Sequence, residues 1–147
     1  MRIYIDTSVV GGVFDKEFEK YSKNLFEKVK GGSLLLVVSN LLQAELINAP
    51  LFVRNYLDNI PVSQIENVNL TPLAMKLADQ YIIEKVVGET SLADCQHIAI
   101  ATIEKVDALI SWNFKHIVNL NRIKGYNSIN LKMGYPSLEI RSPAEII

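Results

Sequence analysis

The 147-residue sequence has a single cysteine, Cys95, and only two histidines, His97 and His116. One cysteine excludes an intramolecular disulfide, and so small a set of Cys and His residues offers no zinc-ligand spacing. No neighbouring feature is expected to activate the thiol, so we interpret Cys95 as a small core residue and not as a nucleophile.

Long apolar runs are also missing. The longest purely apolar run outside the mixed helical segments covers residues 34–38, far short of the roughly 20 residues that a membrane span needs. The first residues lead directly into a strand pattern without the features of a signal peptide. We therefore expect a protein that does not span a membrane and that acts in the cytoplasm.

Neither sign of charge is in large excess. Fifteen Lys and Arg residues face sixteen Asp and Glu residues, for a net charge of −1, which gives no global attraction to nucleic acid. The charge is unevenly distributed, because residues 1–107 carry ten cations and fourteen anions whereas residues 108–147 carry five and two. The cations of this later segment, including Lys115, Arg122, Lys124 and Lys132, could guide a nucleic-acid backbone or form an ordinary solvated face.

The length and the 49% hydrophobic content predict one domain, residues 1–147, with a sizeable core. Short apolar runs that are typical of strands alternate with segments of helical periodicity. The expected strands cover residues 2–5, 34–38, 65–70, 108–110 and 138–141. We expect a short helical turn at residues 117–119 and a loop at residues 125–136. This alternation predicts an α/β fold, a three-layer α/β/α sandwich with a central, mainly parallel sheet.

Polar residues follow two of these strands. Asp6 comes directly after the first strand, and Asn113 follows the strand at residues 108–110. The carboxyl ends of parallel strands share one edge of a sheet, so these residues emerge together if their strands are neighbours. Ser91 and Asp94 have the spacing of a capping box, which places Asp94 in the first turn of a helix. Sites in open α/β sheets form at such strand ends and helix starts, so we predict that Asp6 and Asp94 face one cleft, with Asn113 at its rim.

Carboxylates that share a cleft repel one another, and a divalent cation resolves that conflict. Oxygen-only ligands select hard ions such as Mg²⁺ or Mn²⁺, which activate water and neutralise charge on a phosphodiester. We predict that Asp6 and Asp94 bind such an ion. The simpler alternatives are that Asp6 caps a turn and that Asp94 serves only the helix start and its dipole.

Four segments together resemble the PIN-domain family, specifically the VapC-type ribonuclease toxins. They are Ile-Asp-Thr-Ser at residues 5–8, Glu45 in an early helix, Leu-Ala-Asp-Cys-Gln-His-Ile-Ala-Ile-Ala at residues 92–101, and Leu-Ile-Ser-Trp-Asn-Phe-Lys-His at residues 109–116. The resemblance implies a metal-dependent RNA endonuclease with Asp6, Glu45 and Asp94 as its acidic residues. It also places Asn113 at a fourth position that is often Asp, and Ser8 as a hydroxyl close to the substrate.

Some of these residues have a purely structural alternative. From spacing alone, Glu45 would be a solvent-facing helix residue, and only the resemblance brings it into the site. His97 lies one helical turn from Asp94 and could approach the cleft, but a half-buried structural histidine is the favoured interpretation. Trp112 and Phe114 fit core or interface anchors better than a platform for stacking bases.

The leading hypothesis is therefore a Mg²⁺- or Mn²⁺-dependent ribonuclease with RNA as its substrate. The predicted contacts to the RNA backbone come from Lys115, Arg122 and Lys124. The resemblance implies a small antitoxin protein as partner and leaves a homodimer as a candidate assembly. One alternative is a PIN-like nucleic-acid-binding module with weak or no catalysis. A phosphoacceptor signalling domain is disfavoured, because the second strand ends in Val-Ser-Asn, without an acceptor aspartate.

Overall fold

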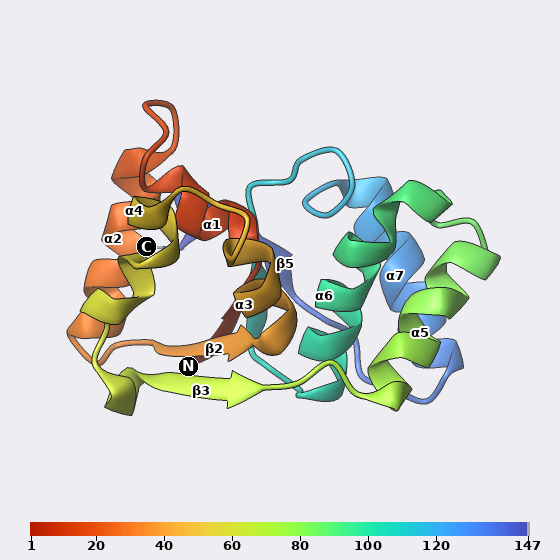
Figure 1. Ribbon diagram of the computed structural model, residues 1–147. Helices are drawn as coiled ribbons and strands as arrows, with labels where there is room; N and C mark the ends of the chain where they lie inside the picture. The colour runs from red at the N-terminus through yellow and green to blue at the C-terminus, as the bar shows by residue number, and fades with distance from the viewer. Residues whose placement is uncertain (147) are drawn as a thin grey trace.

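The computed structural model describes residues 1–146, and a sheet of five parallel strands lies at its centre (Figure 1). The strands follow the apolar runs of the sequence. They are β1 (Arg2–Ile5), β2 (Leu35–Ser39), β3 (Ile65–Val68), β4 (Ala108–Ile110) and β5 (Ile140–Arg141). Every pairing is parallel, and the order is β3-β2-β1-β4-β5. The predicted α/β fold with a parallel sheet is confirmed.

The strand order places a topological switch between β1 and β4. The chain adds β2 and β3 on one side of β1 and then crosses to add β4 and β5 on the other. The last residues of the two central strands, Ile5 and Ile110, are paired in register. The residues that follow, Asp6 and Ser111, therefore emerge side by side at the edge where open α/β sheets bind ligands.

Helices cover both faces of the sheet, as Figure 1 shows. The first half of the chain supplies α1 (Thr7–Gly12), α2 (Glu19–Lys30), α3 (Asn40–Leu46), α4 (Leu51–Arg54) and the 3₁₀ turns η1 (Tyr56–Asn59) and η2 (Val62–Gln64). The second half supplies α5 (Pro72–Ile83), η3 (Glu89–Ser91), α6 (Leu92–Ile103), α7 (Leu120–Lys132) and η4 (Pro143–Glu145). Among residues 1–146, no helix has the length and apolar character needed to cross a membrane.

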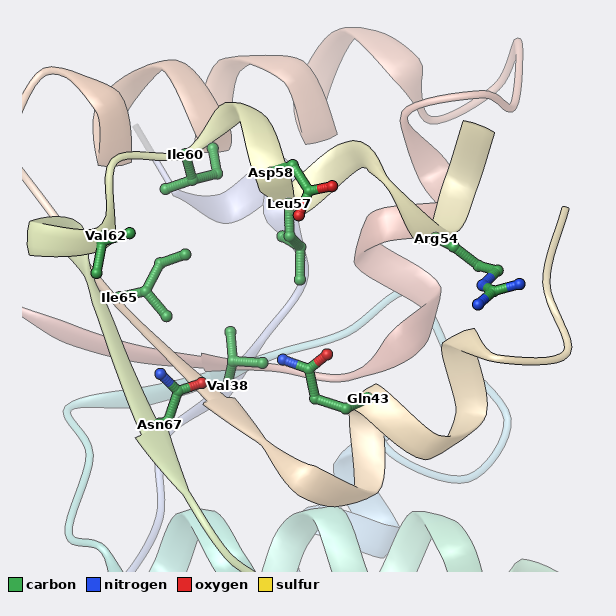
Figure 2. A pocket seen from close by; sticks show the side chains of 9 residues that line it. All are labelled: Val38, Gln43, Arg54, Leu57, Asp58, Ile60, Val62, Ile65 and Asn67. Carbon is green, nitrogen blue, oxygen red and sulfur yellow. The ribbon is translucent and has the colours of Figure 1, made fainter. Parts of the chain in front are cut away.

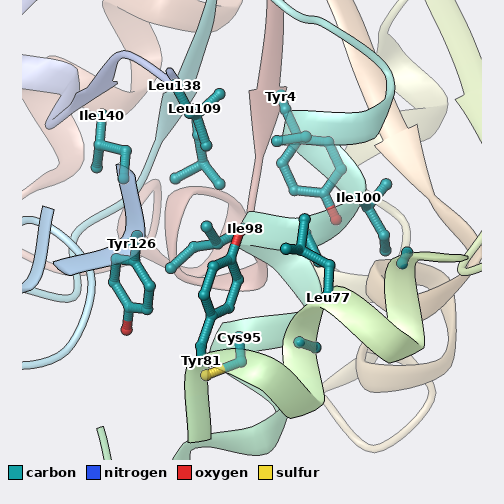
Figure 3. Close-up of a cluster of buried hydrophobic side chains, with 14 of the residues drawn as sticks. Tyr4, Leu77, Tyr81, Cys95, Ile98, Ile100, Leu109, Tyr126, Leu138 and Ile140 are labelled. Carbon is teal, nitrogen blue, oxygen red and sulfur yellow. The ribbon is translucent and has the colours of Figure 1, made fainter. Parts of the chain in front are cut away.

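The core consists of two layers, one on each face of the sheet. Successive residues of a strand point to opposite faces, so Ile3 and Ile5 pack with the buried residues of α1, α2 and α3. Tyr4, between them, packs with α5, α6 and α7, and Figure 3 shows it among Leu77, Ile98 and Ile100. Strands that are buried on both faces explain why the sequence shows continuous apolar runs.

Helix α7 corrects the expectation of a loop at residues 125–136. Its start is capped by Asn119, whose side chain accepts a hydrogen bond from the backbone of Arg122 at 3.2 Å. Gly125 lies inside the helix because a Cβ there would come within 2.7 Å of Val86 Cγ1. Tyr126 and other residues of α7 are buried against the core. The prediction failed because polar residues, and a glycine that packs against Val86, hide the helical period.

Helices α3 and α6 begin in different ways. Ser39 caps α3 by accepting from the backbone N–H of Leu42 at 3.1 Å, while Asn40 Oδ1 accepts from the N–H of Leu70. The capping box at Ser91 does not form, because η3 leads the chain into α6 and Ser91 makes no side-chain cap. Asp94 still lies in the first turn of α6, as predicted.

Candidate active site

Asp6 lies at the end of β1 with only 5% of its surface exposed. Both carboxylate oxygens are held by hydroxyls, since Ser8 Oγ donates to Oδ1 at 2.5 Å and Ser111 Oγ donates to Oδ2 at 2.7 Å. Ser8 Oγ also accepts from the backbone N–H of Trp112 at 2.9 Å. The predicted meeting of the ends of β1 and β4 is therefore confirmed, and the Ser8 hydroxyl is used to orient Asp6.

Asp94 and Asn113 lie together at the same edge of the sheet. Asn113 Nδ2 donates to Asp94 Oδ2 at 3.2 Å. The amide oxygen of Asn113 accepts from the backbone N–H groups of His116 at 2.9 Å and Lys115 at 3.2 Å. Asn113 therefore fixes the loop after β4 with its oxygen and turns its nitrogen toward the acid.

Glu45 joins this edge from α3, and its side chain is 33% exposed. Thr7 Oγ1 donates to Glu45 Oε1 at 2.6 Å, and His97 Nε2 hydrogen-bonds to the same oxygen at 2.6 Å. Within residues 1–146, Glu45 Oε2 receives no side-chain hydrogen bond. Glu45 is therefore held by Thr7 and His97 on one oxygen, while its side chain stays partly exposed.

His97 is fully buried, with 1% exposure, where a half-buried side chain was expected. Its Nδ1 lies 2.6 Å from the Tyr4 hydroxyl, so the ring bridges Tyr4 and Glu45. The other histidine, His116, has a buried Nδ1 without a hydrogen-bond partner in the part of the chain that the structure describes.

The pKa values of the three acids are shifted in different directions. Burial raises the pKa of Asp6, and the charge of Asp94 adds to this rise, while the hydrogen bonds from Ser8 and Ser111 oppose it. Burial also raises the pKa of Asp94, against the opposing influence of both histidines and of Asn113. For Glu45, burial alone would raise the pKa, but the hydrogen bonds from His97 and Thr7 outweigh it and lower the pKa.

The cations predicted to bind RNA lie in two settings. Lys115 and Lys124 are exposed. Arg122 is partly buried, and its guanidinium donates to the carbonyl oxygen of Val86, so this side chain also holds the loop before α6. Arg122 and Lys85 line one pocket beside Gly88.

A separate pocket of about 280 Å³ opens between the β2–β3 edge and the segment that contains α4 and η1 (Figure 2). Apolar side chains such as Leu57 and Ile65 line it, together with the polar groups of Gln43, Arg54 and Asp58. None of the three acids contributes to its wall. It is therefore not part of the acidic site.

No family model and no curated protein matches the sequence, but several solved structures share its fold. The DNA-bound VapBC from Salmonella typhimurium aligns with a TM-score of 0.59 at 14% identity, over 97% of this chain and 98% of that one. VapBC2 from Rickettsia felis, bound to a promoter DNA fragment, aligns with a TM-score of 0.57 at 16% identity over the same shares. The chain has the PIN-domain fold of the VapC toxins. VapC20 from Mycobacterium tuberculosis, described as a toxin that cleaves the sarcin-ricin loop, aligns with a TM-score of 0.58 at 14% identity, over 77% of this chain and 91% of that one.

At the carboxyl edge of the sheet, Asp6 and Asp94 offer carboxylate oxygens, the kind of ligand that hard divalent cations take. In residues 1–146, no three His, Cys, Asp or Glu side chains are arranged to hold an ion together, so the predicted ligand set has two protein carboxylates, Asp6 and Asp94. Mg²⁺ is usually held by one or two carboxylates together with water. Neither acid forms an ion pair with a lysine or arginine among the described residues. Both pKa values are raised, so a bound cation would offset the cost of one buried and one partly buried negative charge.

Four residues of the site were not predicted as site residues. The sequence pattern indicates Ser111, because this residue directly follows β4 as Asp6 directly follows β1. The pattern indicates Thr7 and His97 less strongly, since each lies only within one helical turn of a predicted acid. Nothing in the pattern indicates Tyr4, because an aromatic residue within an apolar strand is typical of core packing.

Proposed function

We propose that this chain is a Mg²⁺- or Mn²⁺-dependent RNA endonuclease and the toxin of a toxin–antitoxin pair, acting in the cytoplasm, where its substrate is present. The observation that carries the proposal is the pair of carboxylates at the β1–β4 switch. Asp6 is buried and Asp94 partly buried, both have raised pKa values, and neither pairs with a lysine or arginine in the described chain. Two negative charges in such a place suit a divalent cation and a phosphate substrate.

In this proposal Asp6 and Asp94 hold the ion. The chemistry that such an ion supplies when bound is the activation of water and the neutralisation of charge on the phosphodiester. Ser8 and Ser111 keep Asp6 in one orientation through hydrogen bonds to both of its carboxylate oxygens. Asn113 orients Asp94 through a hydrogen bond from its amide nitrogen. As a neutral residue it adds no negative charge to those of Asp6, Glu45 and Asp94.

Glu45 takes the role of orienting the attacking water. The hydrogen bonds from His97 and Thr7 outweigh burial and lower its pKa, so they stabilise the carboxylate form. Oε1 is already used by Thr7 and His97, so Oε2 is the oxygen available to accept a proton or hydrogen bond from the water. Lys115 and Lys124 are exposed on and near the loop after β4 and would contact the RNA backbone.

The proposed partner is a small antitoxin protein. Support comes from the similar structures, which include VapBC complexes described as bound to DNA and a toxin–antitoxin complex from Klebsiella pneumoniae. A neighbouring reading frame that encodes a small protein with a DNA-binding start and a disordered tail would favour this proposal. A homodimer is a second assembly to test, by light scattering of the purified protein.

The test is cleavage of single-stranded RNA by the purified protein with Mn²⁺, Mg²⁺ or a chelator. We expect metal-dependent cleavage by the wild type and a loss of several orders of magnitude for Asp6→Asn. The matched control is Asp107→Asn, the same change at the opposite edge of the sheet, where Asp107 accepts from the backbone N–H of Arg2. Equal activity of the two variants, or cleavage that survives the chelator, would refute the proposal.

The alternative is a nucleic-acid-binding PIN-like module with weak or no catalysis, and Asn113 at the fourth position favours it. This alternative predicts that RNA binds without metal-dependent turnover. Measuring binding and cleavage on the same labelled RNA separates the two functions.

A further inference from the structure

A chain of buried polar groups leads from the core of the protein to Glu45. The Tyr4 hydroxyl lies 2.8 Å from Ser39 Oγ and 2.6 Å from His97 Nδ1, and His97 Nε2 lies 2.6 Å from Glu45 Oε1. Tyr4 and Ser39 are fully buried, and His97 has 1% exposure. Tyr4 otherwise lies within the apolar layer shown in Figure 3.

Each member of this chain is rigidly linked to one of the three acids. Tyr4 lies in β1, two residues before Asp6. His97 lies in α6, one helical turn after Asp94. Ser39 caps α3, the helix that carries Glu45. The hydrogen bonds therefore join the three elements whose relative positions determine the geometry of the site.

Core stability alone does not account for these groups. Burying a hydroxyl or an imidazole costs free energy unless its hydrogen bonds are made, and a well-packed apolar group of similar volume is often at least as stable. The Tyr4 hydroxyl and both ring nitrogens of His97 are all engaged within this set of groups. These buried hydrogen bonds are better explained by their effect on Glu45, the one member of the network that is partly open to solvent.

We propose that His97 and Tyr4 are positioning residues that hold Glu45 Oε1 toward the protein and leave Oε2 for the substrate side. This inference rests on the proposed nuclease function, in which Glu45 orients the attacking water. Tyr4 fixes the orientation of the His97 ring, and the ring fixes the carboxylate. Neither residue touches the substrate, so both act only through Glu45.

The first test compares His97→Gln with His97→Asn. The glutamine amide reaches about as far as Nε2 and can restore the hydrogen bond to Glu45, whereas the asparagine amide reaches only the position of Nδ1. We expect His97→Asn to lower kcat on the order of 10- to 100-fold with little change in KM, and His97→Gln to recover much of that loss. Equal kcat values for the two variants would overturn the proposal.

The second test uses two buried tyrosines of the same apolar layer. Tyr4→Phe and Tyr81→Phe each remove one buried hydroxyl, but that of Tyr81 donates to Asn130, away from the acids. Both changes should lower the melting temperature by similar amounts. Only Tyr4→Phe should lower kcat, because only Tyr4 supports His97. Equal losses of kcat would assign Tyr4 a purely structural role.

A double-variant cycle tests whether His97 acts through Glu45. With Glu45→Gln already present, His97→Asn should cause no further loss of kcat. Independent, multiplicative losses would contradict the proposal.

A measurement without substrate or metal separates failure of this inference from failure of the proposed function. NMR titration of the metal-free protein should give a Glu45 pKa below its ordinary value in the wild type. It should be higher in His97→Asn, where burial persists and the hydrogen bond is lost, and unchanged in Tyr81→Phe. An unchanged Glu45 pKa in His97→Asn would overturn the positioning role even if RNA is cleaved. A raised pKa in a protein that cleaves no RNA would instead reject the nuclease proposal.

Discussion

Asp6 is a proposed metal ligand, and its burial lowers the stability of the fold. The effect on stability can be tested by changing this one residue. Its pKa is raised in the folded protein, mainly by burial. The folded state therefore holds the proton more tightly than the unfolded state, and stability falls as pH rises through the folded-state pKa. A carboxylate that destabilises its own fold at neutral pH suggests selection for something other than stability.

Asp6→Asn should accordingly raise the melting temperature at pH 7, because burial makes ionisation of Asp6 more costly in the folded state than in the unfolded state. Each kcal/mol gained corresponds to about 2–4 °C for a chain of this size. The gain should shrink as the pH falls and should vanish below the ordinary Asp pKa of about 3.9, where the Asp6 carboxyl is protonated in both the folded and the unfolded state. Thermal unfolding across this pH range is the measurement. A gain independent of pH, or a loss at pH 7, would show that Asp6 is not a destabilising charge.

Asn113 allows a second prediction, because its amide nitrogen faces an acid. Asn113→Asp replaces that donor with a like charge beside Asp94, so the protein should be less stable in chelator. The added carboxylate should also lower the Mn²⁺ concentration needed for half-maximal stabilisation. Asn113→Ala serves as the control that removes the donor without adding charge. If Asn113→Asp alters neither quantity, Asn113 lies outside the metal site.

The sequence was informative about residues at the ends of strands and less so elsewhere. Asp6 and Asn113 could be predicted because a polar residue after a buried apolar run marks the carboxyl edge of a parallel sheet. Glu45 could not be assigned from spacing, since its neighbours in α3 do not reveal that Thr7 and His97 hold it. Contacts between distant segments depend on the strand order, which local patterns do not encode.

At the scale of elements, the loop after β4 and helix α7 carry the cations proposed to bind RNA. Lys115 and Lys124 are exposed, whereas Arg122 also donates to the carbonyl of Val86. Replacing both lysines with Gln should weaken RNA binding and flatten its salt dependence by about 0.7 units of slope for each lost contact on single-stranded RNA. Binding measured over a series of salt concentrations tests this. An unchanged slope would show that the two lysines do not contact the RNA and only form part of a solvated surface.

Arg122→Gln is the matched comparison on the same helix. It removes a side-chain hydrogen bond as well as a charge, so it should lower the melting temperature, which the two lysine changes should leave almost unaltered. Thermal unfolding of both variants provides the measurement. Equal changes in melting temperature for Arg122→Gln and the lysine changes would show that the Arg122 side chain does not stabilise the fold more than the two lysines do.

The elements themselves were predictable where the apolar pattern was continuous. Strands β1, β2 and β4 and the two helices that pack most closely, α5 and α6, follow runs or periods that few polar residues interrupt. Helix α7 was missed because its buried positions are separated by Asn, Lys and Gly, and because Gly125 serves close packing against Val86 instead of ending a helix.

At the scale of the whole molecule, the strand order is the feature that brings the site together. Asp6, Glu45 and Asp94 lie far apart in sequence, and they meet because β1 is flanked by β2 on one side and β4 on the other. The same architecture appears in VapC structures at 14–16% identity. Such a likeness establishes the fold, while the chemistry depends on the few side chains at this edge.

The central claim is that Asp6 and Asp94 form a divalent-cation site, and thermal unfolding with Mn²⁺ tests it most directly. An ion that binds only the folded state raises the melting temperature. We expect Mn²⁺ to stabilise the wild type, a chelator to reverse this effect, and an Asp6→Asn, Asp94→Asn double variant not to respond. Equal stabilisation of the wild type and the double variant by Mn²⁺ would contradict it.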